Sequence, residues 1–218
     1  MEIRIQNLSK EYSNSRQKRI IFENTNFEFG QASSCAIVGR SGSGKSTLLR
    51  IISGMDIDYD GEFFLNGKRI RKNKASFSKY RFQNVAIIEQ NPILLEDRDV
   101  YHNLIFPIDV KKIEMSTDLD LIVNTLQIRE LLDEYPKNLS GGEIQRVAIA
   151  QALIQNPKLV LADEPTSELD AQTEKEVMDL FKILQKKGIS FIISTHSPYI
   201  ASQCTKQYII QGHKLLPY

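Results

Sequence analysis

The chain has 218 residues, enough for one large domain or for one domain with a subdomain, and its formal net charge is +1. This near-neutral balance gives no global indication of a nucleic-acid partner. The N-terminus lacks the apolar core of a signal peptide, and no run approaches the ~18 apolar residues of a membrane helix, so any link to a membrane is expected to come through a partner. Two distant cysteines, Cys35 and Cys204, are weak evidence for a disulfide and favour a reducing cytosol.

The first part of the chain predicts strands. "EIRIQNL" and "FENTNFEFG" alternate between apolar and polar residues, as half-buried strands do, and "SNSRQKR" (13–19) between them is expected to form an exposed basic hairpin loop. "SCAIVG" is apolar without alternation, which is typical of a strand buried on both faces. A helix is expected from Lys45 to about Ser53. "GEFFLNGKRI" predicts a second hairpin, with Asn66 and Gly67 at its turn.

The rest of the chain alternates between strands and helices. "NVAIIEQ", "KLVLADE" and "ISFIISTH" are apolar runs typical of buried strands. Helices are expected from Gly142 to about Gln155 and over "AQTEKEVMDLFKILQKKG". Residues 91–136 carry helical patterns, notably "LDLIVNTLQIRELL", and the last twenty residues are expected to form a short helix and one strand. The order predicts an α/β fold with a β-rich beginning and a helical insertion at about 91–136.

One glycine-rich loop predicts nucleotide binding. "GRSGSGKS" matches the pattern G-x-x-x-x-G-K-[ST] at Gly39, Gly44, Lys45 and Ser46, between a predicted buried strand and a predicted helix. The glycines let successive backbone N–H groups turn toward one anion, and the helix N-terminus adds partial positive charge. In such loops the lysine reaches the β- and γ-phosphates, and the serine hydroxyl ligates Mg²⁺. We therefore expect ATP and Mg²⁺ at this loop.

A second element offers the carboxylates that ATP hydrolysis needs. Asp163 and Glu164 end the predicted strand in "LVLADE". In P-loop ATPases an aspartate at such a strand end holds Mg²⁺, and a neighbouring carboxylate can activate the attacking water. The alternative is a pair of solvated acids before the turn at Pro165. The P-loop in the same chain favours the functional interpretation.

Two more strand ends carry polar residues. His196 ends "ISFIISTH", where a histidine beside a nucleotide would contact the γ-phosphate and orient the water; the alternative is an ordinary surface or core histidine. Gln90 ends "VAIIEQ" in the same way, and its alternative is a polar strand terminus.

A second glycine-rich stretch, "LSGGEIQR" at Leu139–Arg146, needs an explanation, because one ATP does not need two phosphate-binding loops. Together with the P-loop, the strand-end glutamine, "LADE", "SELD" and His196, in this order, it resembles the ATP-binding cassette (ABC) ATPase family along nearly the whole chain. The stretch looks like the signature motif of that family, which serves the ATP of a neighbouring subunit. The resemblance implies a single ABC domain: a P-loop NTPase core (about 1–90 and 137–218) with an N-terminal antiparallel β subdomain, and an inserted helical subdomain (about 91–136).

The resemblance also assigns roles to residues. Tyr12 matches the aromatic residue that stacks on adenine, Glu164 the catalytic base, and Gln90 the residue that senses the γ-phosphate; Lys45, Gln90 and His196 join Glu164 as catalytic groups. The metal-binding residues implied are Ser46, Gln90 and Asp163. The nucleotide-binding residues implied are Tyr12, Gly39, Arg40, Ser41, Gly42, Ser43, Gly44, Lys45, Ser46, Thr47, Ser140, Gly141, Gly142, Glu143 and Asp170.

The family also suggests partners. The resemblance implies a homodimer that sandwiches ATP, or pairing with a second cassette, and a membrane transporter subunit docked near residues 90–106, with the chain on the inner face of the cell membrane. No nucleic acid is expected. Within the family, the sequence most resembles the group of exporters of macrolides, lipoproteins, antimicrobial peptides and bacteriocins. Alternatives are an importer of the amino-acid type, suggested by "EPTSELD", and a non-transport cassette. Glu143, Ile144, Glu168 and "EDRDVYHNL" depart from the common pattern.

Overall fold

The computed structural model describes residues 1–13, 18–30, 33–106 and 119–218. The centre of the expected basic hairpin loop (14–17) and part of the expected helical insertion (107–118) lie outside these ranges. Within the described ranges, no helix is both long enough and apolar enough to cross a membrane.

The N-terminal strands form a four-stranded antiparallel sheet. Its order is β2-β1-β4-β5, and its strands are β1 (Ile3–Ser13), β2 (Lys18–Phe29), β4 (Asp60–Leu65) and β5 (Lys68–Ile70). The predicted turn joins β4 to β5, with φ values of 49° at Asn66 and 75° at Gly67. Positive φ at both central residues is what a tight hairpin of this kind requires, and it is the reason that Asn-Gly occurs here.

The second sheet has six strands in the order β10-β9-β3-β8-β7-β6. All neighbours are parallel except β10 and β9, which form a C-terminal hairpin. The sequence predicted one strand at this end and the structure has two, because the "GH" turn at Gly212 and His213 adopts positive φ and lets the chain reverse. The strands are β3 (Ser34–Val38), β6 (Val85–Ile88), β7 (Leu159–Asp163), β8 (Ser190–Thr195), β9 (Lys206–Gln211) and β10 (Lys214–Pro217).

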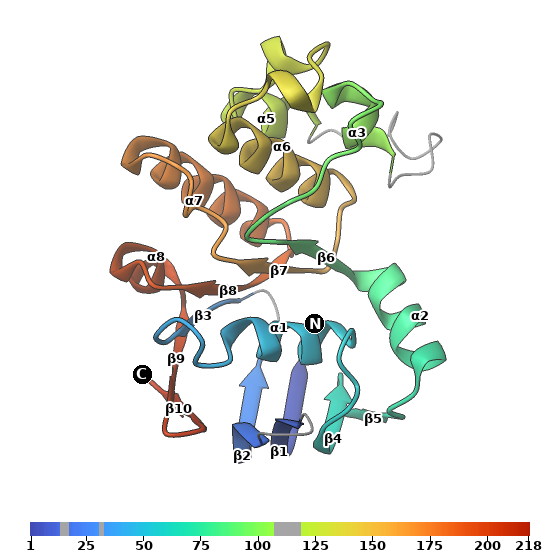
Figure 1. Ribbon diagram of the computed structural model, residues 1–218, viewed down its shortest axis with the longest axis vertical. Helices are drawn as coiled ribbons and strands as arrows, with labels where there is room; N and C mark the ends of the chain where they lie inside the picture. Colours follow the sequence, from blue (N-terminus) through green and yellow to red (C-terminus); the bar gives the residue numbers. More distant parts are fainter. Residues whose placement is uncertain (14–17, 31–32, 107–118) are drawn as a thin grey trace.

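Helices cover both faces of this sheet (Figure 1). On one face α1 is held between the two sheets, and on the other lie α6, α7 and the helical part that contains α3 and α5. The helices are α1 (Lys45–Ser53), α2 (Lys74–Asn84), α3 (Val100–Ile105), α5 (Leu119–Thr125), α6 (Gly141–Ile154), α7 (Ala171–Lys186) and α8 (Pro198–Gln203), with 3₁₀ turns η1 (Arg129–Leu131) and η2 (Pro136–Asn138).

One helix was not predicted from the sequence, and one predicted helical pattern is divided into two elements. Helix α2 was not predicted, because its sequence "KASFSKYRFQN" buries only Phe77 and Tyr80 and carries no clear apolar stripe. The pattern "LDLIVNTLQIRELL" does not form one continuous helix. It forms α5 and then η1, and between them Gln127 has a φ of 51°, which interrupts the α-helical backbone.

Alternating residues of the parallel strands supply two cores. Val160 and Ala162 of β7 face α6 and α7, whereas Leu159 and Leu161 face α1 and the four-stranded sheet. Cys35 and Cys204 are free and buried, and burial raises the pKa of the Cys35 thiol to about 12.

Because β3, β6, β7 and β8 are parallel, the segments after their carboxyl ends meet at one edge of the sheet. The predicted active-site residues follow these strand ends.

Candidate active site

The P-loop joins β3 to α1 and is built around glycines with unusual backbone conformations. Gly42 and Gly44 have φ values of 74° and 113°, and a Cβ on Gly44 would lie 2.7 Å from Ile21. Gly44 is also the N-cap of α1 and supplies no side-chain acceptor, so the first N–H groups of the helix are left for another acceptor. A cradle of this kind, too tight for side chains and rich in N–H donors, fits a phosphate group.

Lys45 folds back over this loop. Its ammonium donates to the carbonyl of Gly39 at 2.9 Å and pairs with Glu164 Oε1 at 3.3 Å, and both side chains are about nine-tenths buried. A buried ion pair of this kind balances two charges that are each costly to desolvate alone. The pair therefore holds the lysine and the carboxylate together at the mouth of the P-loop.

Glu164 is fixed from three sides. Its φ is 47°, a conformation that non-glycine residues adopt rarely and at a cost of about 1–3 kcal/mol. Its backbone N–H donates to the carbonyl of Ser194 at 3.1 Å, and its Oε2 lies 2.8 Å from His196 Nδ1 and 3.2 Å from the His196 backbone nitrogen. The strained backbone thus aims the carboxylate at Lys45 on one side and at His196 on the other.

These residues share one pocket with most of the P-loop. Its lining is formed by Tyr12, Arg19, Ile21, Ser41, Gly42, Gly44, Lys45, Ser46, Thr47, Gln90, Asp163, Glu164 and His196. Three predicted P-loop residues, Gly39, Arg40 and Ser43, belong to the loop without lining this pocket. Tyr12 is 42% exposed, and its hydroxyl donates to Asp56 Oδ2 at 3.2 Å.

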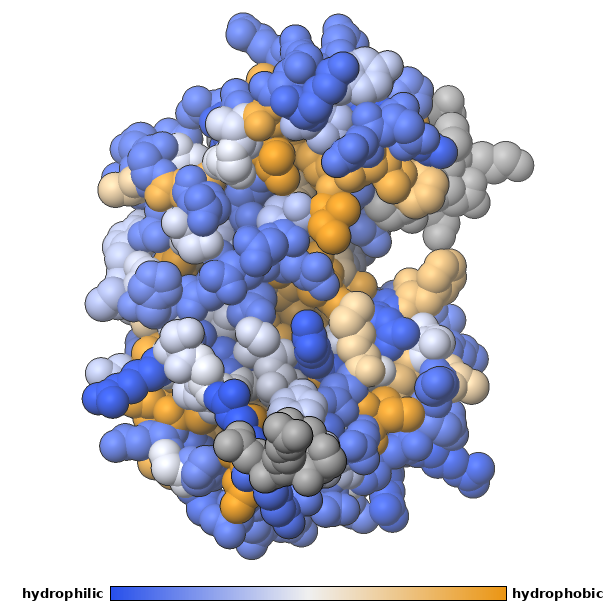
Figure 2. Space-filling model, in the orientation of Figure 1, coloured by the Kyte–Doolittle hydropathy of each residue, from blue (hydrophilic) through white to orange (hydrophobic). Residues whose placement is uncertain are grey.

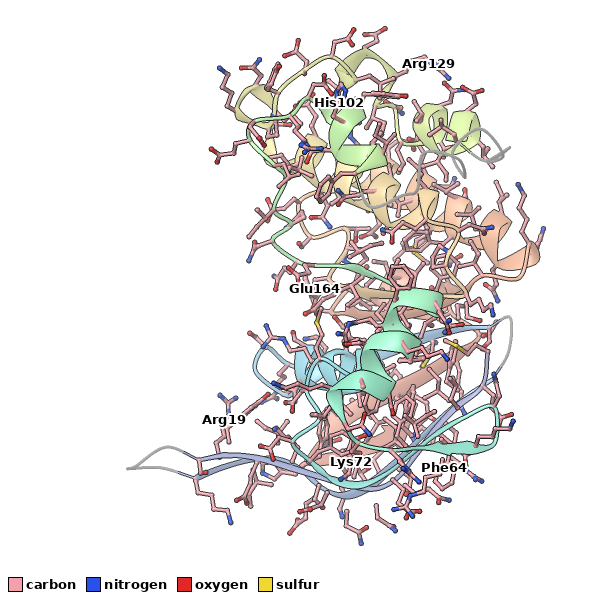
Figure 3. The ribbon with its side chains drawn as sticks, turned by 90° about the vertical axis from the view of Figure 1, so that its right-hand side faces the viewer. Arg19, Phe64, Lys72, His102, Arg129 and Glu164 are labelled. Atoms are coloured by element: carbon pink, nitrogen blue, oxygen red, sulfur yellow. The ribbon has the colours of Figure 1, made fainter. Side chains whose placement is uncertain are left out.

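Arg19 is a pocket residue that the sequence did not single out. It was counted with the solvated basic loop, yet its guanidinium donates to the carbonyl of Gly42 at 2.7 Å. Figure 3 shows Arg19 and Glu164 along the same edge of the molecule. No sequence signal separates Arg19 from Lys18, which instead pairs with Glu11 on the neighbouring strand at 2.7 Å.

The oxygen donors of the pocket fit a magnesium ion that travels with a nucleotide. Ser46, Gln90 and Asp163 all line it, and Asp163 is itself oriented by a hydrogen bond from the Ser194 hydroxyl. Over the described residues, no group of three or more His, Cys, Asp or Glu side chains forms an all-protein metal cage. Mg²⁺ favours a site with few protein oxygens beside a phosphate-binding loop, because the ion keeps several of its waters and binds the phosphates of the substrate.

The signature stretch lies apart from this pocket. Ser140 is the N-cap of α6 and forms a capping box with Glu143: the carboxylate accepts from the Ser140 backbone N–H and from its hydroxyl, both at 2.7 Å. These hydrogen bonds, the hydroxyl first, hold the pKa of Glu143 below its usual range. Residues Ser140–Glu143 are not part of the pocket lining, so the chain does not bring its two glycine-rich stretches together.

Asp170 has a visible structural task. Its carboxylate caps α7, accepting from the N–H groups of Gln172 at 2.9 Å and Thr173 at 3.0 Å. Hydrogen bonds from Thr173, its hydroxyl first, lower the pKa of Asp170. The same loop reaches the signature, because a Cβ on Gly142 would lie 3.2 Å from the Glu168 carbonyl oxygen.

Comparison with known families identifies the chain. A family model described as "ABC transporter" matches residues 22–167, which is most of the sequence. The chain belongs to the ABC transporter family. Within this family it is an ATPase cassette, with the α/β fold and the antiparallel β subdomain that were expected from the sequence. Its larger sheet is mixed, because the C-terminal strand β10 is antiparallel to β9.

Two curated ABC relatives are equally similar and have different names. The methionine import ATP-binding protein MetN of Francisella tularensis subsp. tularensis is 37% identical, over 98% of this chain and 62% of that protein. The lipoprotein-releasing system ATP-binding protein LolD of Blochmanniella floridana is also 37% identical, over 96% of this chain and 91% of that protein. The cassette thus spans about three fifths of the length of this MetN relative.

Solved ABC structures share the whole fold. The dimeric bacterial ABC transporter cassette MJ0796 matches with a TM-score of 0.88 at 26% identity, over 98% of this chain and 96% of that one. A dimeric post-hydrolysis state of MJ0796, bound to ADP and Pi, matches with a TM-score of 0.86. The protein cbiO1 of Clostridium perfringens, part of the ABC transporter complex cbiONQ, matches with a TM-score of 0.81 at 27% identity.

Proposed function

We propose that this cassette binds and hydrolyses ATP as a dimer and thereby drives a membrane transporter. The observation that carries the proposal is the separation of the two glycine-rich stretches: the P-loop pocket gathers Asp163, Glu164 and His196, while Ser140–Glu143 stays outside it. Each stretch is then half of an ATP site, completed by a second copy or by another cassette. The dimeric MJ0796 structures support this arrangement.

The pocket residues divide into groups that bind ATP and groups that react with it. In the proposed complex the P-loop and Arg19 bind the phosphates and Tyr12 stacks on adenine. Ser46, Asp163 and Gln90 hold Mg²⁺, which neutralises charge on the phosphate oxygens when it is bound. The signature residues Ser140, Gly141 and Gly142 of the partner close the site over the γ-phosphate, and the hydroxyl and N–H groups at the start of α6 support that role.

Glu164 is the proposed general base. The phosphates attract the Lys45 ammonium, which leaves the Glu164 carboxylate free to accept a proton from the attacking water. The oxygen of this water bonds to the γ-phosphorus as the bond to the bridging oxygen breaks. His196 contacts Glu164, which supports its proposed role of orienting the water and the γ-phosphate.

Replacing this carboxylate by an amide tests the proposal. We expect Glu164→Gln to bind Mg-ATP, to lose hydrolysis, and to accumulate as an ATP-bound dimer, because the amide keeps the shape and cannot accept the proton. Gel filtration with and without ATP measures the dimer, and phosphate release measures turnover. Hydrolysis by the variant at near the wild-type rate would remove Glu164 from the role of base.

We further propose an exporter, or a pump that acts on its membrane partner, for peptides, drugs or lipoproteins, with the cassette on the cytoplasmic face of the membrane. The similarity to LolD supports this choice, and the equal similarity to MetN favours an importer as the second candidate. The partner docks near residues 90–106. Purifying the cassette together with its native membrane protein tests both the export and the import proposal. A membrane partner that belongs to an importer would exclude the export proposal.

A further inference from the structure

One segment of the cassette concentrates positive charge. Residues 63–88 contain seven lysines and arginines and no aspartate or glutamate. Because the whole chain has a net charge of only +1, the remaining residues together are net negative. The positive charges lie on β5, on α2 and on the short link between them, and none of them lines the nucleotide pocket.

Most of this charge is not neutralised within the described part of the chain. Arg69 pairs with Glu62 at 2.8 Å, Lys72 donates to the Tyr59 carbonyl, and Arg81 donates to the carbonyls of Ser53 and Gly54. The other four are exposed, and no described carboxylate lies within 4.0 Å of their charged atoms. These four are Lys68, Arg71, Lys74 and Lys79.

An aromatic side chain stands among these charges. Phe77 and Tyr80 define the buried face of α2, so helical geometry puts Phe82 on the opposite side, between Lys74 and Lys79. Phe82 is 94% exposed. A large aromatic residue in water, flanked by lysines, is the composition of surfaces that lie at a membrane interface.

The position of α2 also favours a location at a membrane interface. Helix α2 leads through β6 directly into the proposed docking segment at 90–106, where Ile93 is 88% and Phe106 57% exposed. Helices α2 and α3 lie along the same edge of the molecule (Figure 1), and Figure 2 shows hydrophobic residues on both sides of an indentation there. A membrane protein seated at 90–106 therefore turns this edge toward the bilayer.

We propose that the basic surface formed by Lys68, Arg71, Lys74, Lys79 and Phe82 contacts anionic lipid headgroups beside the membrane partner. Lysine and arginine attract anionic headgroups, and Phe82 inserts its ring at the level of the headgroups. The inference rests on the proposed function, because docking at 90–106 is what orients the surface. It adds a lipid contact made by the cassette itself.

Vesicle flotation with the full chain tests the contact. We expect the wild type to float with phosphatidylglycerol-containing vesicles at low salt, not with pure phosphatidylcholine vesicles, and to be released by high salt. Lys74→Glu/Lys79→Glu lowers the vesicle partition coefficient by at least about fivefold for each lysine, since each basic residue near an anionic surface contributes about 1 kcal/mol. Phe82→Ser weakens binding without a change of charge.

The matched control is Lys175→Glu/Lys186→Glu, which makes the same charge change on α7. Both lysines are exposed, and α7 lies across the molecule from α2. We expect the control to keep vesicle binding. Three results would overturn the proposal: no binding of the wild type to anionic vesicles, an equal loss in the α7 control, or α2 lysines that bind RNA or an acidic protein segment but not vesicles.

The proposed function is judged separately. ATP-driven dimerisation of Glu164→Gln is measured without lipid, so its failure counts against the ATPase proposal. If the wild type does not bind anionic vesicles while ATP still drives dimerisation of Glu164→Gln, the result counts against the lipid contact alone.

Discussion

Glu164 illustrates how single residues are prepared for chemistry at this site. Its positive φ is unfavourable, yet it brings one carboxylate between Lys45 and His196. Sequence predicted the residue from its place after a buried strand. It did not predict the backbone strain, the ion pair with Lys45 or the support from Ser194, because these depend on side chains that meet only after the strands align.

Arg19 supplies a prediction at the same scale. Arg19→Ala removes a cation from the pocket and a hydrogen bond to the P-loop carbonyl of Gly42, so we expect ATP affinity to fall by about tenfold, from the loss of a charged hydrogen bond. Titration with a fluorescent ATP analogue measures the change. The matched control is Arg129→Ala, at the far end of the molecule (Figure 3), which should keep wild-type affinity. Equal affinities for the two variants would exclude Arg19 from nucleotide binding.

At the scale of elements, a single asparagine organises the proposed docking segment. Asn103 of α3 is fully buried, and its side chain accepts from the Leu95 N–H at 2.7 Å and donates to the carbonyls of Leu95, Arg98 and Asp99. These bonds hold a coil of residues 91–99 that lacks regular backbone pairing. This role could not be predicted from the sequence, because a helical asparagine can be exposed or can form hydrogen bonds with many different partners.

Asn103→Leu should loosen that coil. The substitution leaves several carbonyls and one N–H without their partner, and we expect the free energy of unfolding to fall by about 3 kcal/mol. Hydrogen exchange of 91–99 should accelerate, while ATP binding at the distant P-loop stays unchanged. Tyr101→Leu is the control, because Tyr101 is an exposed neighbour on α3. Unchanged protection of 91–99 in Asn103→Leu would mean that other contacts hold the coil.

At the scale of the whole molecule, the site depends on parallel strands that end at one edge of a sheet. The apolar runs predicted β3, β6, β7 and β8, and the family resemblance assigned site roles to Lys45, Gln90, Glu164 and His196, which line one pocket in the structure. The amphipathic pattern did not predict α2, because the exposed face of this helix is basic and its buried face consists of few residues. The family resemblance anticipated the remote position of the signature, whereas the residue pattern alone suggested only a second phosphate-binding loop.

Mixing two defective chains tests the central claim, that each glycine-rich stretch serves a different ATP site. Ser140→Arg blocks the signature and keeps its own P-loop, whereas Lys45→Ala damages the P-loop and keeps its signature. In a heterodimer of the two, one composite site carries both defects and the other carries neither. ATP hydrolysis and ATP-driven heterodimer formation are measured together, each variant alone serving as the control.

We predict that both variants are inactive alone and that mixing restores ATP hydrolysis in proportion to the heterodimer present, or restores ATP-driven dimerisation if turnover needs two intact sites. A signature that acts on the ATP of its own chain predicts no recovery, because every chain in the mixture still carries a defect at its only site. Folded variants that regain neither hydrolysis nor dimerisation on mixing would contradict the account.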